Sequence, residues 1–500
     1  MNIKAIRLTN FRGFRDARIE LKPLTVLLGP NSAGKSSFGQ ALAAMAHVHR
    51  SNRSTPQASL TPPKTREKEN WPVDLGLTDD LRMVGTEGPV RIGLETSGGL
   101  VELGFGGLPD SQKLLLSYVL HPSGEQSTVA GINPDNAIAM VSQIPPSEVV
   151  PIKGEVKEIS SAIELQRRNV NQWQDGASAA SVTLDGLIVL AVQHTTSPPL
   201  VLGSDVSVEL PGAQVVPAVE NRTFISRTLS GVASTDLRSL LEQLTYLRAN
   251  RKRASRGYEH DFHDQQKIGY SGEFAPSVLL DRGTEPVTLL LPPPIPNTVE
   301  EAQKCDFAWE ERQAPLLEAL GVWLSQIELA HSIEAVPPTL EERNVLLRVD
   351  KNRDITEVGF GVSQVVPILV AGLLQPKDSL FIVDLPEAHL HPRPQAAIAD
   401  FFCAMALSGR SVLVETHSEM FFHRLRLRAA MDPKLMEKIA VYSIDQPTGE
   451  GCARPRSMGL RFEDELRWPE GFLHEAWEME MQIKAVREAN RIRANDSASA

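Results

Sequence analysis

The sequence predicts an α/β protein in which a mixed sheet with flanking helices carries a long insertion, β-rich at first and helical later. Near the N-terminus, the apolar run of residues 24–28 leads into the loop GPNSAGKSS, and an alanine-rich helical pattern follows it. Near the C-terminus, residues 379–384 and 411–416 are two more apolar runs, and a helical pattern over residues 362–374 precedes the first of them. Short apolar runs that alternate with helical patterns indicate buried strands of one sheet.

The length of 500 residues exceeds what one hydrophobic core usually holds, so several domains or one heavily inserted domain are expected. We expect the two halves of the main domain in residues 1–50 and 341–480. Residues 51–340 form the predicted insertion, and residues 481–500 are expected to be a charged helix with a frayed tail.

The first half of the chain has clear strand and helix patterns. Residues 1–28 contain three strand patterns, IKAIRL, ARIEL and LTVLLG, and GKSSFGQALAAMAHV is a helical pattern without proline. The insertion begins with a polar loop over residues 50–70 and continues with short strand patterns between Val90 and Leu210. STDLRSLLEQLTYLRANR, residues 234–251, has helical spacing.

The second half begins with TEPVTLLLPPPIPNTVEE, residues 284–301, whose closely spaced prolines predict an irregular connector. Residues 314–327 and 362–374 have the patterns of apolar helices. NVLLRVDKNRDITEVGF, between those helices, is expected to be a hairpin that turns at KNRD.

The composition narrows the classes of function. A net charge of -11 argues against binding of nucleic acid by overall electrostatics, although a local basic patch stays open. The cysteines, Cys305, Cys403 and Cys452, are far apart and form no CxxC pair, so neither a disulfide framework nor a zinc site is expected. The N-terminus has no signal-peptide pattern and no apolar run is long enough to span a bilayer, so we expect a cytoplasmic protein without a membrane partner.

The loop GPNSAGKSS fits the pattern G-x-x-x-x-G-K-[ST], with the apolar strand before it and the helix after it that a phosphate-binding loop requires. Its glycines let backbone N–H groups point at phosphates, while Lys35 adds a positive charge and Ser36 offers a hydroxyl to Mg²⁺. ATP and Mg²⁺ are therefore the expected cofactors. The residues expected to bind the nucleotide are Gly29, Asn31, Ser32, Ala33, Gly34, Lys35, Ser36 and Ser37.

Two polar residues at strand ends complete this half of the predicted site. Asp384 ends the strand LFIVD and suits a carboxylate that binds a water on Mg²⁺, so Ser36 and Asp384 are the expected metal residues. His417 follows the next strand, and parallel neighbouring strands would bring both carboxyl ends to the phosphate-binding edge. A histidine there can bond the terminal phosphate or the attacking water; the alternative is a helix-capping or core histidine.

VGFGVSQVVP, residues 358–367, is a glycine-bearing turn that opens an apolar helix. Gly359 and Gly361 expose backbone N–H groups and Ser363 can cap the helix, so the segment could bind an anion. Glycine before a helix is common, however, so by itself this pattern is equally consistent with a purely structural turn.

Together these segments resemble the ABC-type ATPases of the RecF, SMC and OLD (overcoming lysogenization defect) kind. NFRGF, residues 10–14, resembles the N-terminal strand pair of that group, residues 29–37 its Walker A loop, residues 359–364 its signature turn, residues 380–384 its Walker B strand, and His417 its switch histidine. PEAHLHPRPQ, VETHSEMFFHRLRLR and WPEGF, with LTYLRANR and IGYSGEFAPSVLL in the insertion, are similar to one bacterial branch of OLD-like ATPases that has a C-terminal region of unknown function. The resemblance implies an ABC-type P-loop ATPase head.

In that family two heads sandwich two ATP molecules, and the signature turn of one subunit meets the nucleotide of the other. The resemblance therefore implies a homodimer, or a higher oligomer, in which Gly361, Ser363 and Gln364 act in trans. With Gln364 aligned to the glutamine of the usual signature, Gly361 stands where a serine is usual, and Ser363 is the expected substitute.

The catalytic carboxylate is the second departure from the family. Leu385 follows Asp384, where ABC ATPases usually have the glutamate that polarises water. Glu387 comes two residues later, past Pro386, and the related branch keeps a glutamate there. The resemblance thus implies Glu387 and His417 as catalytic residues of a slow, dimer-dependent ATPase.

Other motifs are less specific. Many OLD relatives carry a Toprim nuclease after the ATPase, and the residues after His417 leave no room for one, so none is expected. HDFHD, residues 260–264, has no standard metal spacing and is expected to be a solvated loop. LRANRKRASR, residues 247–256, is strongly basic and could bind nucleic acid or form a solvated charged face.

Three functions are consistent with the sequence. The first is an ATP-driven dimeric switch, the ATPase or sensor subunit of a bacterial anti-phage defence system that acts with a separately encoded effector. The second is a scaffold that binds nucleotide and hardly hydrolyses it. The third is a RecF- or SMC-like DNA-repair ATPase that binds DNA directly, so nucleic acid stays open as a partner.

Overall fold

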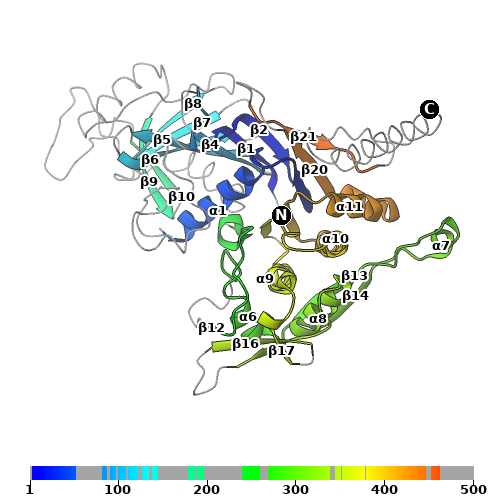
Figure 1. The fold of residues 1–500 in the computed structure, drawn as a ribbon. Helices are drawn as coiled ribbons and strands as arrows, with labels where there is room; N and C mark the ends of the chain where they lie inside the picture. Colours follow the sequence, from blue (N-terminus) through cyan, green and yellow to red (C-terminus); the bar gives the residue numbers. More distant parts are fainter. Residues whose placement is uncertain are drawn as a thin grey trace, which may run out of the picture.

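The structure is a computed structural model of the chain, shown in Figure 1. Its backbone is described for residues 3–51, 81–86, 90–96, 99–108, 111–121, 127–133, 138–144, 178–185, 188–195, 239–259, 268–337, 344–350, 352–377, 379–445 and 452–461.

A six-stranded sheet forms the centre of the molecule, in the order β11-β18-β19-β3-β20-β21. Its four inner strands are parallel: β3 (Leu24–Leu28), β18 (Leu380–Asp384), β19 (Ser411–Glu415) and β20 (Ile439–Ile444). At the edges, β11 (Thr245–Leu247) is parallel to β18 and β21 (Pro455–Met458) is antiparallel to β20. The prediction of an α/β fold with a mixed sheet is confirmed.

Each face of this sheet packs against its own hydrophobic core. In β18, Phe381 and Val383 belong to one core, while Leu380 and Ile382 belong to the other. A parallel sheet covered on both faces explains why β3, β18 and β19 are buried throughout and mostly apolar.

Helices and strands divide between the two faces. On the first face lie α8 (Leu316–Gln326), α9 (Phe360–Leu374), α10 (Pro392–Leu407) and α11 (Glu419–Met431), with the short α12 (Pro433–Glu437) after them. On the second face lies α1 (Ser36–Ser51), together with the first strands of the chain. The central sheet is therefore the middle layer of three.

The first strands begin a second sheet that is antiparallel throughout, in the order β10-β9-β8-β7-β6-β5-β4-β1-β2 (Figure 1, blue to green). Its strands are β1 (Ile3–Phe11), β2 (Phe14–Glu20), β4 (Val90–Thr96), β5 (Gly99–Leu108), β6 (Ser111–His121), β7 (Ser127–Asn133), β8 (Ile138–Ile144), β9 (Ser178–Asp185) and β10 (Ile188–Thr195). Because β4 pairs with β1, the β-rich part of the predicted insertion continues the N-terminal sheet.

The rest of the predicted insertion forms the lower part of the molecule in Figure 1. Its strands β12 (Tyr258–Glu259) and β15 (Ile333–Val336) form a small sheet with β16 (Asn344–Val349) and β17 (Arg353–Asp354), which follow the predicted insertion in the chain. The helix α6 (Ala275–Arg282) packs against this sheet, and the 3-10 turn η3 (Ile355–Glu357) comes after it. The hairpin of β13 (Pro286–Leu291) and β14 (Glu310–Pro315) projects from this part and ends in α7 (Val299–Lys304).

Two sequence-based element predictions are wrong. The helix predicted over residues 234–251 is described as helical only for residues 239–243, and β11 follows it, because Thr245–Leu247 pairs with β18. Residues 286–291 of the predicted irregular connector form β13, which a partner strand beyond α7 stabilises. In both places a tertiary partner that is distant in sequence overrides the local pattern.

Most other predictions are confirmed, including the N-terminal strands, α1, α8, α9 and the hairpin that turns before β17. HDFHD, WPEGF, the strand pattern that ends at Leu210 and the C-terminal charged helix lie outside the described residues. Among the helices that the structure describes, none combines the length and apolar character needed to cross a membrane.

Candidate active site

The loop between β3 and α1 has the backbone conformation of a phosphate-binding loop. Gly29 has φ 146°, Ser32 has φ 62° and Gly34 has φ 98°, so the chain turns repeatedly through the left-handed region. A side chain at Gly29 would collide with the carbonyl oxygen of Ile444, so this position also needs glycine for close approach. Asn31 and Ser32 are exposed at the tip of the loop.

Lys35 closes this loop from inside. Its Nζ donates to the carbonyl oxygens of Gly29 at 3.0 Å and Pro30 at 2.6 Å, and the residue is buried. Burial lowers the pKa of Lys35, while the charges of Glu415 and Glu387 oppose the shift. The charges of these two carboxylates favour the protonated form of Lys35, so the side chain can present a positive charge to a phosphate.

Asp384 and Glu415 form a pair of buried carboxylates at the carboxyl ends of neighbouring strands. The two residues are in register across β18 and β19, and Ser36 Oγ donates to Glu415 Oε1 at 2.9 Å. Burial raises the pKa of both carboxyl groups, and for Asp384 the charge of Glu415 adds to the shift. Glu415 was missed in the sequence, although the strand SVLVE ends in a carboxylate just as LFIVD does.

This pair fits a magnesium ion. Glu415 Oε2 is buried and has no hydrogen-bond partner within the described part of the chain, and a divalent cation would relieve the repulsion between the two carboxylates. Ser36, Asp384 and Glu415 are the residues that would hold Mg²⁺ or its waters. Mg²⁺ takes few protein ligands and usually completes its shell with phosphate oxygens and water.

Two residues, one in β11 and one in the segment after it, hold Asp384 in place. The hydroxyl of Tyr246 donates to Asp384 Oδ2 at 2.6 Å, and both groups are buried. Arg251 donates from Nη1 to the carbonyl oxygen of Asp384 at 2.9 Å and from Nη2 to that of Leu385 at 2.7 Å. Neither residue was predicted for the site, because no local pattern links this segment to Asp384.

Arg251 also changes the interpretation of the basic stretch 247–256. It is 3% exposed, and burial lowers its pKa to about 10, against the charges of Glu387 and Asp384. Lys252, Arg253 and Arg256 are exposed. The stretch therefore supplies one structural cation to the active site and leaves three exposed basic residues at the surface.

Glu387 reaches the site through a strained turn. Leu385 has φ 46°, in the left-handed region that a leucine rarely adopts, and Leu385 N donates to the carbonyl oxygen of Glu415 at 2.8 Å. Glu387 Oε1 accepts a hydrogen bond from His417 N at 2.7 Å, whereas Oε2 is buried without a partner among the residues described. Burial raises the pKa of Glu387.

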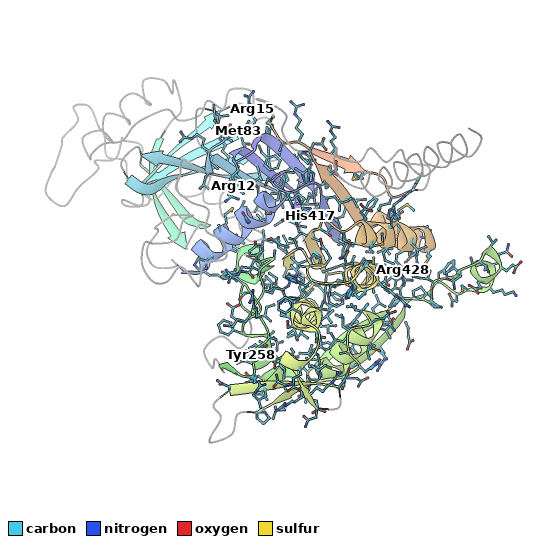
Figure 2. All side chains as sticks on the ribbon, in the orientation of Figure 1. Arg12, Arg15, Met83, Tyr258, His417 and Arg428 are labelled. Carbon is cyan, nitrogen blue, oxygen red and sulfur yellow. The ribbon has the colours of Figure 1, made fainter. Side chains whose placement is uncertain are left out.

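His417 lies near the centre of the molecule, as Figure 2 shows, and is half-buried beside the phosphate loop. Burial lowers the pKa of His417 to about 4, the positive charge of Lys35 contributes, and a hydrogen bond to the backbone of Gly29 opposes the shift. The imidazole is therefore neutral near pH 7 and can donate from one nitrogen while it accepts at the other.

The predicted signature residues lie at the start of α9. Ser363 Oγ donates to the carbonyl oxygen of Phe360 at 2.8 Å, and Gly361, Ser363 and Gln364 are buried. Gly359 and Phe360 are the exposed part of the turn, and the Phe360 ring contacts the ring of His389 with centroids 4.8 Å apart. Within one protomer the turn makes local contacts, so its expected role toward a second protomer stays a prediction.

Two family models match the chain. Residues 1–102 match the AAA ATPase domain, and residues 322–422 match the model described as AAA domain, putative AbiEii toxin, Type IV TA system. Together with the phosphate loop and the paired carboxylates, these matches support a nucleotide-dependent P-loop ATPase. Among curated proteins no match was found.

Solved structures that are similar include the SMC head bound to the C-winged helix domain of ScpA, at 9% identity and TM-score 0.36, which covers 92% of this chain and 98% of that chain. The SMC head domain from Thermotoga maritima is 9% identical with TM-score 0.31, and the match covers 91% of this chain and 99% of that chain. At these scores the likeness adds nothing to the assignment.

Proposed function

We propose that the protein is a slow ATPase of the ABC type that acts as a dimeric, nucleotide-dependent switch. The observation that carries this proposal is the convergence of Lys35, Ser36, Asp384, Glu387 and Glu415 at the carboxyl ends of β3, β18 and β19. In open α/β sheets this edge is where ligands bind.

Each residue has a distinct task in the proposed reaction. Lys35 and the backbone N–H groups of the loop bind the outer phosphates, and Ser36, Asp384 and Glu415 hold Mg²⁺, which neutralises phosphate charge when bound. Glu387 Oε2 takes a proton from the attacking water while the water oxygen bonds to the γ-phosphorus and the bond to the ADP oxygen breaks. His417 orients the terminal phosphate.

Glu387 suits the role of base because its free oxygen is buried. A carboxylate whose pKa is raised by burial is a stronger base than an exposed one. Its other oxygen is fixed by His417 N, so the group is oriented but cannot move freely. This restriction, together with Leu385 at the usual position of the base, supports slow turnover.

The proposed setting is the bacterial cytoplasm, where the protein would act with a separately encoded effector in defence against phage. The match of residues 322–422 to a model whose description names a toxin system supports this setting. In the proposed dimer, Gly361, Ser363 and Gln364 of one protomer approach the nucleotide held by the other.

A nucleotide-binding scaffold that hardly hydrolyses is the second candidate. It is supported by Leu385, which occupies the position after Asp384 with a side chain that cannot polarise water. Direct binding of DNA is supported less well, because Arg251 is buried and only Lys252, Arg253 and Arg256 of the basic stretch are exposed among the residues described there.

The test combines equilibrium binding of radiolabelled ATP with single-turnover hydrolysis. Lys35→Ala is expected to abolish binding, whereas Lys252→Ala, an exposed lysine, leaves it unchanged. Glu387→Gln is expected to retain binding and to lower the hydrolysis rate about 100-fold or more, the range of general base catalysis. Glu334→Gln, an exposed glutamate on β15, is the matched control.

The outcomes separate the candidates. Binding of ATP with no hydrolysis by the wild-type protein would establish the scaffold instead of the ATPase. Unchanged hydrolysis in Glu387→Gln would show that another group is the base. Equal ATP binding by Lys35→Ala and wild-type protein would contradict the proposed nucleotide site.

A further inference from the structure

A chain of polar contacts connects the β1–β2 turn with Asp384. Arg12 Nη1 donates to Gln40 Oε1 at 2.6 Å, and the side chain of Gln40 is close enough to the hydroxyl of Tyr246 to lower its pKa against the effect of burial. Tyr246 in turn donates to Asp384 Oδ2 at 2.6 Å. The four residues come from the β1–β2 turn, α1, β11 and β18, so the chain joins four elements that are distant in sequence.

The direction of these contacts is the same throughout. The Oε1 of Gln40 accepts from Arg12, which has no acceptor of its own, so the amide N–H of Gln40 is the group that faces the Tyr246 oxygen. The Tyr246 proton is then directed at Asp384. Each donor polarises the next, which strengthens the bond that ends on the carboxylate.

The packing around the chain is close. Gly39, next to Gln40 in α1, faces β18, and a Cβ there would lie 2.8 Å from Ile382 Cγ2, 3.8 Å from Asp384 Oδ1 and 3.9 Å from Tyr246 Cε2. The absent side chain therefore allows α1 to approach β18 and Tyr246. Arg12 has φ 50°, so the turn that presents it has a backbone conformation uncommon outside glycine (Figure 2).

Asp384 has two oxygens with different surroundings. Oδ2 is bound by Tyr246, which fixes the plane of the carboxylate and leaves Oδ1 on the side of α1. Groups that hydrogen-bond a metal-binding carboxylate in this way determine its orientation and hence the affinity for the metal.

We propose that Arg12, Gln40 and Tyr246 are positioning residues that hold the Asp384 carboxylate in the orientation required to bind Mg²⁺, and so couple the β1–β2 turn to the metal site. This proposal rests on the proposed nucleotide site. It gives Arg12, the arginine of NFRGF, a function in orienting Asp384, which lies outside the phosphate loop.

The experiment measures the Mg²⁺ concentration that half-saturates binding of a fluorescent ATP analogue, at equilibrium and without turnover. Tyr246→Phe removes only the hydroxyl and is expected to raise this concentration about tenfold or more, the usual effect of losing a partner of a metal-binding group. Tyr442→Phe is the matched control, because Tyr442 is also a buried tyrosine and its hydroxyl accepts a hydrogen bond from Glu20 N at 2.9 Å, away from Asp384.

A second variant tests the direction of the chain. Gln40→Glu keeps the size of the side chain and an acceptor for Arg12, but the carboxylate cannot donate to Tyr246. It is expected to raise the half-saturating Mg²⁺ concentration as well, and the double variant with Tyr246→Phe should be no worse than Tyr246→Phe alone. A role in packing alone would leave Gln40→Glu like the wild-type protein.

The proposal is overturned if Tyr246→Phe and Gln40→Glu both need the same Mg²⁺ concentration as the wild-type protein. It is also overturned if they weaken binding equally with and without Mg²⁺, because the effect would then be on the fold of the loop. Failure of the proposed function has a different signature, since the wild-type protein itself would then show no Mg²⁺-dependent binding of the nucleotide.

Discussion

Arg251 provides the sharpest test of how the structure assembles the active site. Replacement by methionine keeps most of the aliphatic volume but removes the two donors that hold the carbonyl oxygens of Asp384 and Leu385, at 2.9 Å and 2.7 Å. A hydrogen bond from a charged donor contributes about 1.5–3 kcal/mol, so the two together contribute about 3–6 kcal/mol. Loss of a buried cation returns part of its desolvation penalty, which leaves a net destabilisation of about 3 kcal/mol.

The assay is unfolding by urea and by heat in the absence of nucleotide. For a chain of 500 residues a destabilisation of about 3 kcal/mol corresponds to a fall in melting temperature of about 3 °C, because the entropy of unfolding grows with chain length. Lys252→Met and Arg253→Met are matched controls in the same basic stretch; both residues are exposed, so changes within about 0.5 kcal/mol are expected.

The reasoning about Arg251 fails if Arg251→Met unfolds at the same temperature as Lys252→Met. In that case the two carbonyl oxygens would be satisfied in another way, and the basic stretch would be a surface feature throughout. A nucleotide-dependent readout adds to this test, because a displaced Asp384 should also reduce the rise in melting temperature that ATP with Mg²⁺ produces.

The remaining predictions concern the proposed dimer and the buried arginine Arg428. Gly359→Glu adds a charge at an exposed position where a Cβ meets nothing within 4 Å, so the variant should fold normally but lose ATPase activity. Mixing it with inactive Lys35→Ala protein should restore activity, because a mixed dimer contains one intact composite site. No recovery on mixing would argue against sites shared between protomers. Arg428→Met removes a buried bidentate ion pair with Asp400, at 2.8 and 2.9 Å, and a hydrogen bond to the carbonyl oxygen of Pro293. Urea unfolding should therefore show a free energy of unfolding that is lower by about 3–5 kcal/mol. A decrease of less than about 1 kcal/mol would mean that the pair contributes little net stability.

The buried strands illustrate what sequence patterns predict well. LFIVD and SVLVE are apolar because both faces of the central sheet are covered, and the parallel pairing that brings Asp384 beside the end of the next strand was expected and is confirmed. The prediction of a helix over residues 234–251 was wrong because a tertiary contact outweighed the local pattern. β11 is a strand of three residues at the edge of the sheet, and its pairing with β18 outweighs a local helical pattern.

The candidate active site also combines features that the sequence predicted with features that it did not. Glu387 and His417 were predicted from their motif, and the structure brings them into contact through a hydrogen bond of 2.7 Å. Their catalytic roles stay predictions. The expected substitute for the signature serine, Ser363, is engaged within its own helix, so its role depends on a partner that the isolated chain does not contain.

The sequence by itself determined the phosphate loop, since the conformation of that loop depends on glycines and neighbours that are contiguous in the chain. Only the tertiary structure decided which groups surround Asp384. Tyr246 and Arg251 lie 138 and 133 residues before it, and Glu415 meets Ser36 across 379 residues. Such contacts arise from strand pairing and packing between distant segments, and no local spacing of residue types encodes them.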